Sequence, residues 1–297
     1  ERGWTTDAFH DRLDRATEQL HAARQQRPHP HRDEKILLGW NALMVTAYVR
    51  AWHALGRTAY WKRAEWCLDF LLEKFQSPVS GLRHVYQAGE ARQPAFLNDY
   101  AFLIEALLEA YSLRYDTTLL DRAAALTEEA LRLFSDEEQR LFYFSAEQSD
   151  GPLLRRRERY DAEMPSGNAQ MAANLQRLGL LFDRVDWRAR AGRMLQSLLP
   201  ALTEDPLPFA RWATAVLAEI DGFDEVAIVG PRAYALADKL QRHFLPNLLL
   251  MAHPAGDDRY PLLQHRPATD DTQLYLCRNY ACQQPVNSVE ELLEIMG

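Results

Sequence analysis

Three aspartates carry the side chains best suited to acid–base chemistry, and each lies at or just before the start of a strongly apolar segment. Asp33 precedes "ILLGWNALM", Asp99 lies within "FLNDYAFLIEALL", and Asp161 precedes "MPSGNAQMAANL". Hydrolysis of a glycosidic bond requires two carboxylates flanking the bond, because one acts as the acid and the other as base or nucleophile. We therefore predict Asp99, Asp33 and Asp161 as catalytic candidates, with Asp99 first. The alternative is that each aspartate caps a helix, which contributes about 1 kcal/mol of stability.

Other polar side chains lie beside these aspartates and are suited to bind a substrate. The Trp40 indole could stack on the apolar face of a sugar, and the Asn41 amide could exchange hydrogen bonds with its hydroxyl groups. The alternative is that Trp40 belongs to the core and that Asn41 binds a loop carbonyl. Lys35 could pair with Asp33 or Asp99, or bind an anionic group of a substrate, and Tyr100 could orient a sugar hydroxyl. The last two candidates are Ser166, which could equally cap a helix, and Asn168.

Helices of two kinds alternate along the first 220 residues and would position these side chains. One apolar face is predicted for the helices at 5–24, 58–75, 119–134 and 187–199, and a wider apolar surface for those at 36–55, 96–113, 169–182 and 208–220. A helix that is apolar all round must be covered on every side, whereas a one-faced helix can lie on the surface. This alternation of outer and inner helices predicts an α/α toroid. A solenoid of helical hairpins would produce the same rhythm.

The lengths of the connections predict where a site would lie. The connections from an inner to an outer helix are short, such as "GRT" at 56–58, whereas those that lead into the helices at 36, 96 and 169 are long. Long loops on a rigid scaffold are where function is usually carried. We therefore expect Asp33, Trp40, Asn41, Asp99 and Asn168 to line one concavity at the end of the bundle where the inner helices begin.

After residue 221 the pattern changes to short strands. Strands are predicted at 225–230, 247–252 and 273–277, and helices at 234–244 and 289–296. We expect two domains, a toroid at 1–222 and a small α/β appendage at 223–297. The lone Gly230 after a strand does not make a dinucleotide-binding motif, so no nucleotide cofactor is expected.

Composition excludes several classes of partner. The chain has a net charge of −8 and a pI of about 5.6, and its arginines are spread among carboxylates, so we expect no nucleic-acid partner. No apolar stretch is long enough to span a bilayer, and we expect a cytoplasmic protein. The three cysteines are expected to be reduced. Cys277 and Cys282 are read as buried, inert thiols, with a redox role as the alternative.

Histidines offer a second chemistry, that of an epimerase, in which a base removes a proton next to a carbonyl group. His29, His31 and His84 lie at the long-loop end, although none is on an inner-helix face. His29 and His31 fit a solvated, proline-rich loop better than a zinc site, which would need two further ligands. We expect no metal and no other cofactor.

Three ordered stretches carry a resemblance to a known family. "DEKILLGWNALM" (33–44), "FLNDYAFLIEALLEAY" (96–111) and "DAEMPSGNAQMAANLQRL" (161–178) resemble the C-terminal region of thioredoxin-domain-containing, six-hairpin-barrel proteins, and "GLRHVYQAG" (81–89) and "LYLCRNYACQQPV" (274–286) also fit. The resemblance implies an incomplete (α/α)6 barrel like that of six-hairpin glycosidases and N-acylglucosamine 2-epimerases, with a thioredoxin-like domain and further hairpins expected before Glu1. In the family two adjacent aspartates usually occupy the second motif, whereas Asn98 replaces the first of them here.

Two functions follow as expectations. The first is a carbohydrate-directed barrel, either a glycoside hydrolase or a sugar isomerase or epimerase, that holds a sugar or other polar small molecule in its funnel. The second is a non-catalytic barrel that acts as a scaffold or presents a partner to the thioredoxin-like domain. The replacement at Asn98 bears on the choice, because a mechanism that needs both carboxylates lacks one here.

Overall fold

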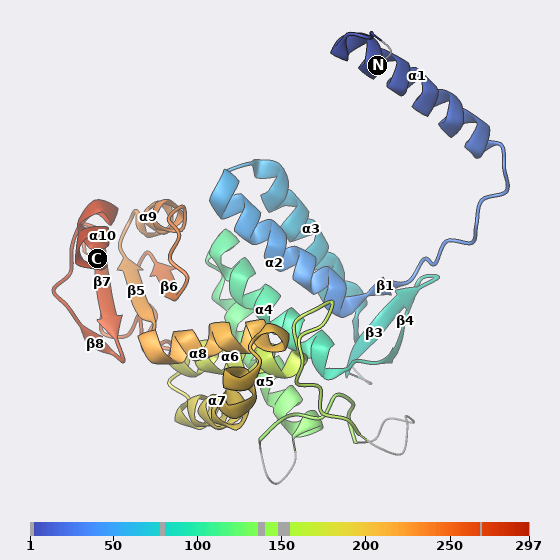
Figure 1. Ribbon diagram of the computed structural model, residues 1–297. Helices are drawn as coiled ribbons and strands as arrows, with labels where there is room; N and C mark the ends of the chain where they lie inside the picture. Colours follow the sequence, from blue (N-terminus) through green and yellow to red (C-terminus); the bar gives the residue numbers. More distant parts are fainter. Residues whose placement is uncertain (1–2, 78–80, 136–139, 148–154, 268, 297) are drawn as a thin grey trace. The chain divides into compact units, whose positions relative to one another are not determined.

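A computed structural model describes residues 3–77, 81–135, 140–147, 155–267 and 269–296 (Figure 1). The chain forms two compact units, Glu1–Lys35 and Ile36–Gly297. The first unit contains helix α1 (Thr6–Gln25), which Thr5 caps by accepting a hydrogen bond from the Ala8 amide. No residue of α1 is buried. The described residues of this unit include no second helix or strand, and the predicted burial of the apolar face of α1 stays a prediction.

Helices of the second unit form two layers, as the sequence predicts. The inner helices are α2 (Leu38–Leu55), α4 (Leu97–Arg114), α6 (Gly167–Leu181) and α8 (Ala210–Asp221), each packed on the next. The outer helices are α3 (Thr58–Lys74), α5 (Thr117–Phe134) and α7 (Val185–Glu204), packed on α2, α4 and α6 respectively. A short 3-10 turn, η1 (Leu207–Phe209), leads into α8. The fold is mainly α and has the architecture of an incomplete (α/α)6 toroid, which confirms the predicted fold class.

The inner helices are not equally buried. Nearly every residue of α4 and α6 is inaccessible to solvent, because both have inner neighbours on two sides and an outer helix behind them. On α2, in contrast, Trp40 and Met44 are exposed, and on α8 so are Leu217 and Ile220. Each of these two helices packs on an inner neighbour on one side only among the described residues, so part of its wide apolar surface is exposed, as is expected for the end helices of an incomplete toroid.

Short strands, not predicted from the sequence, occupy the connections before α2 and α4. β3 (Gly81–Gln87) pairs with β1 (Ile36–Leu37), β2 (Gln76–Ser77) and β4 (Glu90–Pro94), always in the antiparallel sense. The β3–β4 hairpin closes through Ala88 and Gly89, both with positive φ, since Gln87 pairs with Glu90. Two positive φ angles are what a tight two-residue hairpin turn requires, and glycine adopts such angles freely. The hairpin brings His84 to the start of α4.

A four-stranded sheet forms the C-terminal α/β part. Its strand order is β6 (Leu248–His253), β5 (Asp224–Val229), β7 (Gln273–Arg278) and β8 (Ala281–Cys282), with β5 and β6 parallel and the other pairs antiparallel. Helix α9 (Ala233–Leu240) connects β5 to β6 and ends earlier than predicted, and α10 (Val289–Met296) packs beside it. The α/β part contacts the toroid through two buried tyrosines. Tyr111 Oη accepts from the Ala252 amide of β6 at 3.1 Å, and Tyr115 Oη donates to Asp238 of α9 at 2.8 Å.

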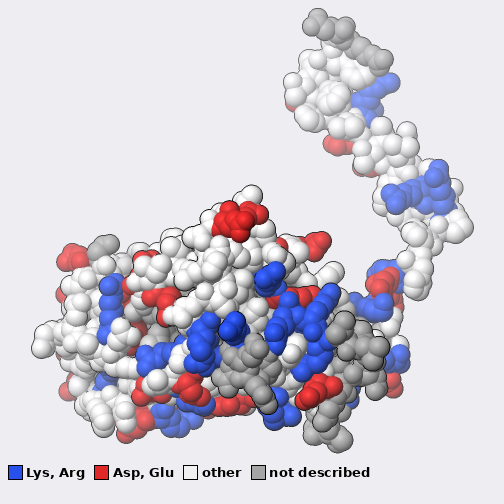
Figure 2. Space-filling model, turned by 60° about the horizontal axis from the view of Figure 1, so that its bottom comes forward, with Lys and Arg blue, Asp and Glu red and all other residues white. Residues whose placement is uncertain are grey.

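Figure 2 shows Lys and Arg side chains gathered across the lower middle of one face, with Asp and Glu around them and uncharged residues over much of the rest. None of the helices in the described parts of the chain is long and apolar enough to cross a membrane.

Candidate functional site

Asp99, the first catalytic candidate, is a buried carboxylate at the start of α4. Its Oδ1 accepts a hydrogen bond from the Gly39 amide at 3.0 Å, and its Oδ2 accepts one from the Phe96 amide at 2.9 Å. His84 Nδ1 lies 2.8 Å from the same Oδ2, and we assign the proton to this nitrogen because a carboxylate can only accept. Asp99 thus joins the starts of α2 and α4 to strand β3, and it is only 2% exposed.

Asn168, at the start of α6, is completely buried and binds backbone groups of two loop residues. Its Oδ1 accepts from the Phe142 amide at 2.7 Å, and its Nδ2 donates to the carbonyl oxygens of Phe142 and Glu158. Ser166 caps α6 by accepting from the Ala169 amide, and its hydroxyl also donates to Glu158 O. The polar residues at the start of α6 therefore hold two loop segments on the helix.

Asp161 holds the starts of two helices. Its Oδ1 accepts from the Ser166 amide at 2.7 Å, just before α6, and its Oδ2 accepts from the Arg211 amide at 2.8 Å, in the first turn of α8. A carboxylate at a helix start satisfies free amides and interacts favourably with the helix dipole. Through this contact Asp161 fixes the backbone that carries the Arg211 side chain.

The other predicted residues are placed differently. Tyr100 is buried against Phe134 of the outer helix α5, and burial raises the pKa of its phenol. Trp40 is 59% exposed, and Asn41 Nδ2 donates to the carbonyl of Leu37, the residue just before α2. In the N-terminal unit, Lys35 pairs with Asp33 at 3.1 Å and lowers the pKa of that exposed carboxyl.

The structure thus brings together the starts of α2, α4 and α6. A methyl group on Gly39 would lie 3.1 Å from Asp99 Oδ1, and one on Gly167 would overlap with Asn98 Oδ1. None of the nine predicted site residues lines the cavity at the opposite ends of these helices. The catalytic and substrate-binding roles assigned to them remain predictions.

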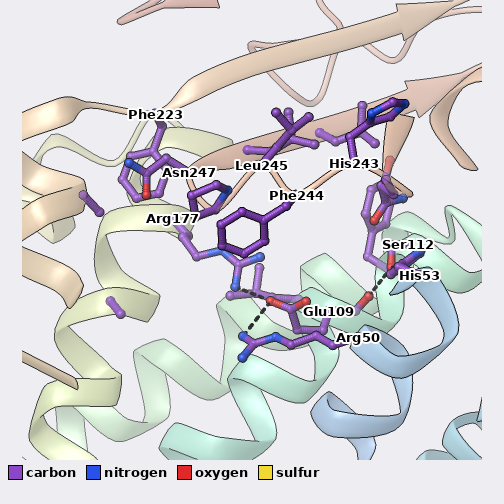
Figure 3. A pocket seen from close by; sticks show the side chains of 18 of the residues that line it. Arg50, His53, Glu109, Ser112, Arg177, Phe223, His243, Phe244, Leu245 and Asn247 are labelled. Carbon is purple, nitrogen blue, oxygen red and sulfur yellow. Dashed lines mark hydrogen bonds and ion pairs between the residues drawn. The ribbon is translucent and has the colours of Figure 1, made fainter. Parts of the chain in front are cut away.

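A cavity of about 550 Å³ lies toward the other ends of the same inner helices (Figure 3). Its walls come from the C-terminal halves of α2, α4 and α6, from α8, and from the segment 241–250 that connects α9 to β6. The volume is within the range of small-molecule sites. Glu109 lies about 15 Å along α4 from Asp99, given the rise of 1.5 Å per residue.

Glu109 is held between two arginines at the base of the cavity. Its Oε1 lies 2.8 Å from Arg177 Nη1 and 3.4 Å from Arg50 Nη2. Burial alone would raise the pKa of Glu109, but Arg177 and Arg50 outweigh it and hold the pKa at about 2. The carboxylate is therefore ionised at neutral pH, and can accept hydrogen bonds from a ligand but not act as an acid.

A second carboxylate extends this network. Glu105, one helical turn before Glu109, is buried and lies 2.9 Å from Arg50 and 3.7 Å from Arg211. Arg211 Nε also donates to Gln170 of α6 at 2.8 Å. Buried charges need such partners, because removal from water is costly for an unpaired ion.

Aromatic and neutral polar groups complete the walls. Phe244 is 92% exposed and projects over the Arg177–Glu109–Arg50 network in Figure 3. His53 Nε2 lies 2.8 Å from Ser112 Oγ, which itself donates to the Glu109 carbonyl, so His53 is the donor. Burial lowers the pKa of His53, which favours the neutral ring at pH 7.

The sequence analysis did not predict the charged residues of this network as site residues, although their positions on apolar helices could have indicated them. Glu105 and Glu109 are four residues apart in "FLIEALLEAY", so they share one face of a helix that is otherwise apolar all round. Arg50 and Arg177 similarly interrupt the apolar helices α2 and α6. Charges on helices that must be buried predict a polar interior site.

No group of three or more His, Cys, Asp or Glu side chains that could hold a metal ion occurs among the residues that the structure describes.

The cysteine prediction needs a correction. Cys277 and Cys282 form a disulfide rather than two inert buried thiols, because they face each other across the β7–β8 hairpin, and Cys282 is exposed. Only Cys67 is a free, buried thiol within the described residues.

The fold and the cavity define the class of protein: an α/α-barrel protein with a polar site among its inner helices. A GH76 α-mannanase from Bacteroides thetaiotaomicron superposes with a TM-score of 0.52 over 83% of this chain and 66% of that one, at 16% identity, which shows a shared fold. No model of a protein family matches the sequence.

Two curated relatives span almost the whole chain. The chain is 29% identical over 300 residues to the uncharacterized protein B0495.5 of Caenorhabditis elegans, and 28% identical over 314 residues to human spermatogenesis-associated protein 20. These alignments cover 96% and 99% of this chain but only 41% and 40% of the relatives. The chain thus spans about two-fifths of the length of the curated relatives that it matches.

Proposed function

We propose that this chain is a carbohydrate-directed barrel and that it binds a sugar in the cavity between α2, α4, α6 and α8. The observation that carries the proposal is the Arg177–Glu109–Arg50 network beneath the exposed ring of Phe244. Ionised side chains form strong hydrogen bonds with hydroxyl groups, and an aromatic ring packs on the apolar face of a sugar. Both features occur in one cavity of suitable volume.

The charge of the cavity narrows the class of sugar. Four arginines line it (Arg50, Arg177, Arg211 and Arg242), and Glu109 with the adjacent Glu105 balances only two of them. An arginine fork matches the geometry of carboxylate and phosphate groups. The preferred ligand in this proposal is a sugar that carries a carboxylate or a phosphate.

Chemistry on a sugar, whether hydrolysis or isomerisation and epimerisation, is a separate expectation that rests on Asp99, Asp33 and Asp161, none of which lines this cavity. The alternative of a non-catalytic scaffold for a thioredoxin-like domain is favoured by one observation. Both oxygens of Asp99 and both of Asp161 already accept hydrogen bonds from the protein. A carboxylate used in this way has a structural role whether or not it also reacts.

Calorimetric titration with glucose, glucuronate, glucose 6-phosphate and inorganic phosphate tests the proposal. We expect the two anionic sugars to bind at least about tenfold more tightly than glucose, since one charge-assisted bidentate contact is worth 1.4 kcal/mol or more. Inorganic phosphate is expected to bind more weakly than glucose 6-phosphate, because it cannot contact Phe244. Absence of binding by every sugar at millimolar concentration would contradict the proposal.

Matched variants locate the binding site. Phe244→Ala is expected to weaken sugar binding about three- to tenfold at little cost in stability, because the ring is exposed. Its control is Leu207→Ala, which removes an equally exposed side chain outside the cavity. Arg177→Gln and Arg242→Gln should reduce the preference for anionic sugars, whereas Arg184→Gln, which removes an arginine paired with Glu128 and Asp186 outside the cavity, should not.

A further inference from the structure

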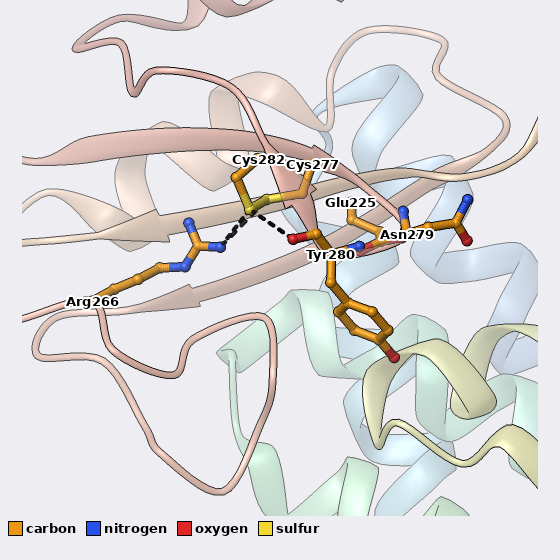
Figure 4. Close-up of a disulfide and its surroundings, with 6 residues drawn as sticks. All are labelled: Glu225, Arg266, Cys277, Asn279, Tyr280 and Cys282. Carbon is orange, nitrogen blue, oxygen red and sulfur yellow. Dashed lines mark hydrogen bonds between the residues drawn. A yellow bond between two sulfur atoms is a disulfide. The ribbon is translucent and has the colours of Figure 1, made fainter.

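The Cys277–Cys282 disulfide joins the two strands of the β7–β8 hairpin (Figure 4). The two residues are direct partners in the antiparallel register, and Arg278 pairs with Ala281 next to the turn. Asn279 and Tyr280 form the turn, both with positive φ. The disulfide therefore closes a very short loop, so it constrains the unfolded chain little and is not needed for the overall fold.

The two sulfur atoms differ in their access to solvent. Cys277 is 1% exposed, since β7 lies between β5 and β8, whereas Cys282 on the edge strand β8 is exposed. Thiol–disulfide exchange requires an incoming thiolate to reach one sulfur atom while the other leaves. Only attack at Cys282 Sγ is open, and Cys277 must then be the leaving thiolate.

A cation is already in place to stabilise that leaving group. Arg266 Nη2 lies 3.3 Å from Cys277 Sγ and 3.1 Å from Cys282 Sγ. In Figure 4 the Arg266 side chain points at the disulfide. The guanidinium packs over the Tyr275 ring, and burial lowers the pKa of Arg266. Among the described residues Arg266 has no carboxylate partner, and its buried Nε has no hydrogen-bond partner.

An arginine that lies beside a disulfide and has no carboxylate partner gains a negatively charged partner when the disulfide is reduced to a thiolate. A neighbouring cation lowers the pKa of a thiol, and a leaving thiol of lower pKa leaves faster. Arg266 therefore stabilises the reduced state of the pair more than the oxidised state. It acts as a positioning residue for the sulfur chemistry.

We propose that Cys277 and Cys282 form a reversible dithiol–disulfide site whose reaction partner is a dithiol reductant. A thiolate of the reductant attacks Cys282 Sγ and forms a mixed disulfide, while the Cys277–Cys282 bond breaks and Cys277 leaves as a thiolate next to Arg266. The second thiol of the reductant then attacks the reductant's other sulfur atom, which is bonded to Cys282 in the mixed disulfide. This attack releases Cys282 as a thiolate. The reductant becomes a disulfide, and its two protons pass to the Cys277–Cys282 pair or to solvent.

The surrounding contacts let this exchange proceed without unfolding. Both turn amides donate to the buried Glu225 carboxylate, Asn279 at 2.7 Å and Tyr280 at 3.2 Å. Tyr280 Oη donates to the Leu180 carbonyl near the end of α6 at 2.8 Å. These contacts hold the turn on the sheet and on the toroid when the sulfur–sulfur bond is open.

Reduction of the folded protein by dithiothreitol tests the proposal. Samples are quenched with iodoacetamide at successive times, and peptide mass mapping follows both cysteines. We expect both to become alkylated at a rate proportional to the dithiothreitol concentration, while the circular dichroism spectrum stays that of the folded protein. A rate that is independent of the reductant and equal to the rate of global unfolding would overturn the proposal.

Two comparisons examine the roles of the individual residues. Arg266→Gln should slow reduction about fivefold, given the dependence of exchange rates on the leaving thiol. The matched control is Arg278→Gln on the same hairpin, whose guanidinium pairs with Asp224 instead of sulfur, and its rate should equal that of the wild type. Glutathione should form its mixed disulfide at Cys282. Equal rates for Arg266→Gln and the wild type, or glutathione found on Cys277, would overturn the proposal.

Discussion

The carboxylate of Asp99 accepts a hydrogen bond from the amide of Gly39, 60 residues earlier in the chain, at 3.0 Å. This contact holds the start of helix α2 against the start of α4, and the approach is close because Gly39 has no side chain. A methyl group at Gly39 would lie 3.1 Å from Asp99 Oδ1 and 3.2 Å from the Phe102 ring. One carboxylate and one glycine thus set the close approach of the two helix starts.

Asp99→Asn is the first test of this relationship. The Asn side chain keeps one oxygen that can accept a hydrogen bond, but its NH2 group replaces the other oxygen and faces a hydrogen-bond donor. We therefore expect a loss of about 2 kcal/mol in the free energy of unfolding, measured by urea denaturation. Sugar binding in the remote Phe244 cavity should be unchanged. Unaltered stability together with loss of turnover would instead support the catalytic role predicted for Asp99.

Gly167→Ala tests the contact between the starts of α4 and α6. The added methyl group would overlap with Asn98 Oδ1, a buried atom without a hydrogen-bond partner, so we expect a loss of about 1–3 kcal/mol. The double variant Asn98→Ala with Gly167→Ala should recover part of the loss, since the obstructing side chain is gone. Strictly additive effects in this double-mutant cycle would show that Asn98 is not the obstruction.

Glu109 makes stability depend on pH in the acid range. Its folded-state pKa of about 2 lies below the ordinary value of 4.5, so its contribution is complete above pH 4.5 and is lost as the pH falls toward 2. We expect Glu109→Gln to remove about 2–3 kcal/mol of this pH-dependent stability. Urea midpoints measured between pH 2 and 6 give the comparison, with the more exposed Glu128→Gln as the matched control.

Tyr115→Phe tests whether the α/β part at 223–297, predicted as a separate domain, melts independently of the toroid. The hydroxyl of Tyr115 donates to Asp238 and accepts from Gln241, and its loss leaves Asp238 without this donor. We expect a decrease of about 1–2 kcal/mol that shifts one calorimetric transition as a whole. Two separate transitions, of which only one responds, would show an independent α/β domain. Tyr234→Phe is the control, since it keeps the ring that stacks on Tyr115.

Local patterns determined the helices and their order. The predicted inner helix at 96–113 corresponds to α4 (Leu97–Arg114), and the helix at 289–296 was predicted correctly as α10. Both follow from hydrophobic periodicity, which is a property of consecutive residues. The residues that cap helices, such as Ser166, were also recognisable, because capping involves neighbours three residues away.

Tertiary structure alone decided what the polar residues contact. Asp99 meets Gly39 and His84, and Asn168 meets Phe142 and Glu158, through loops whose course no periodicity records. The cavity likewise depends on Phe244, which lies far along the chain from Glu109 yet projects over it because the 241–250 segment returns to the toroid. Each contact is set by the packing of whole helices, since a hydrogen bond between distant residues forms only when the core places both groups within about 3 Å.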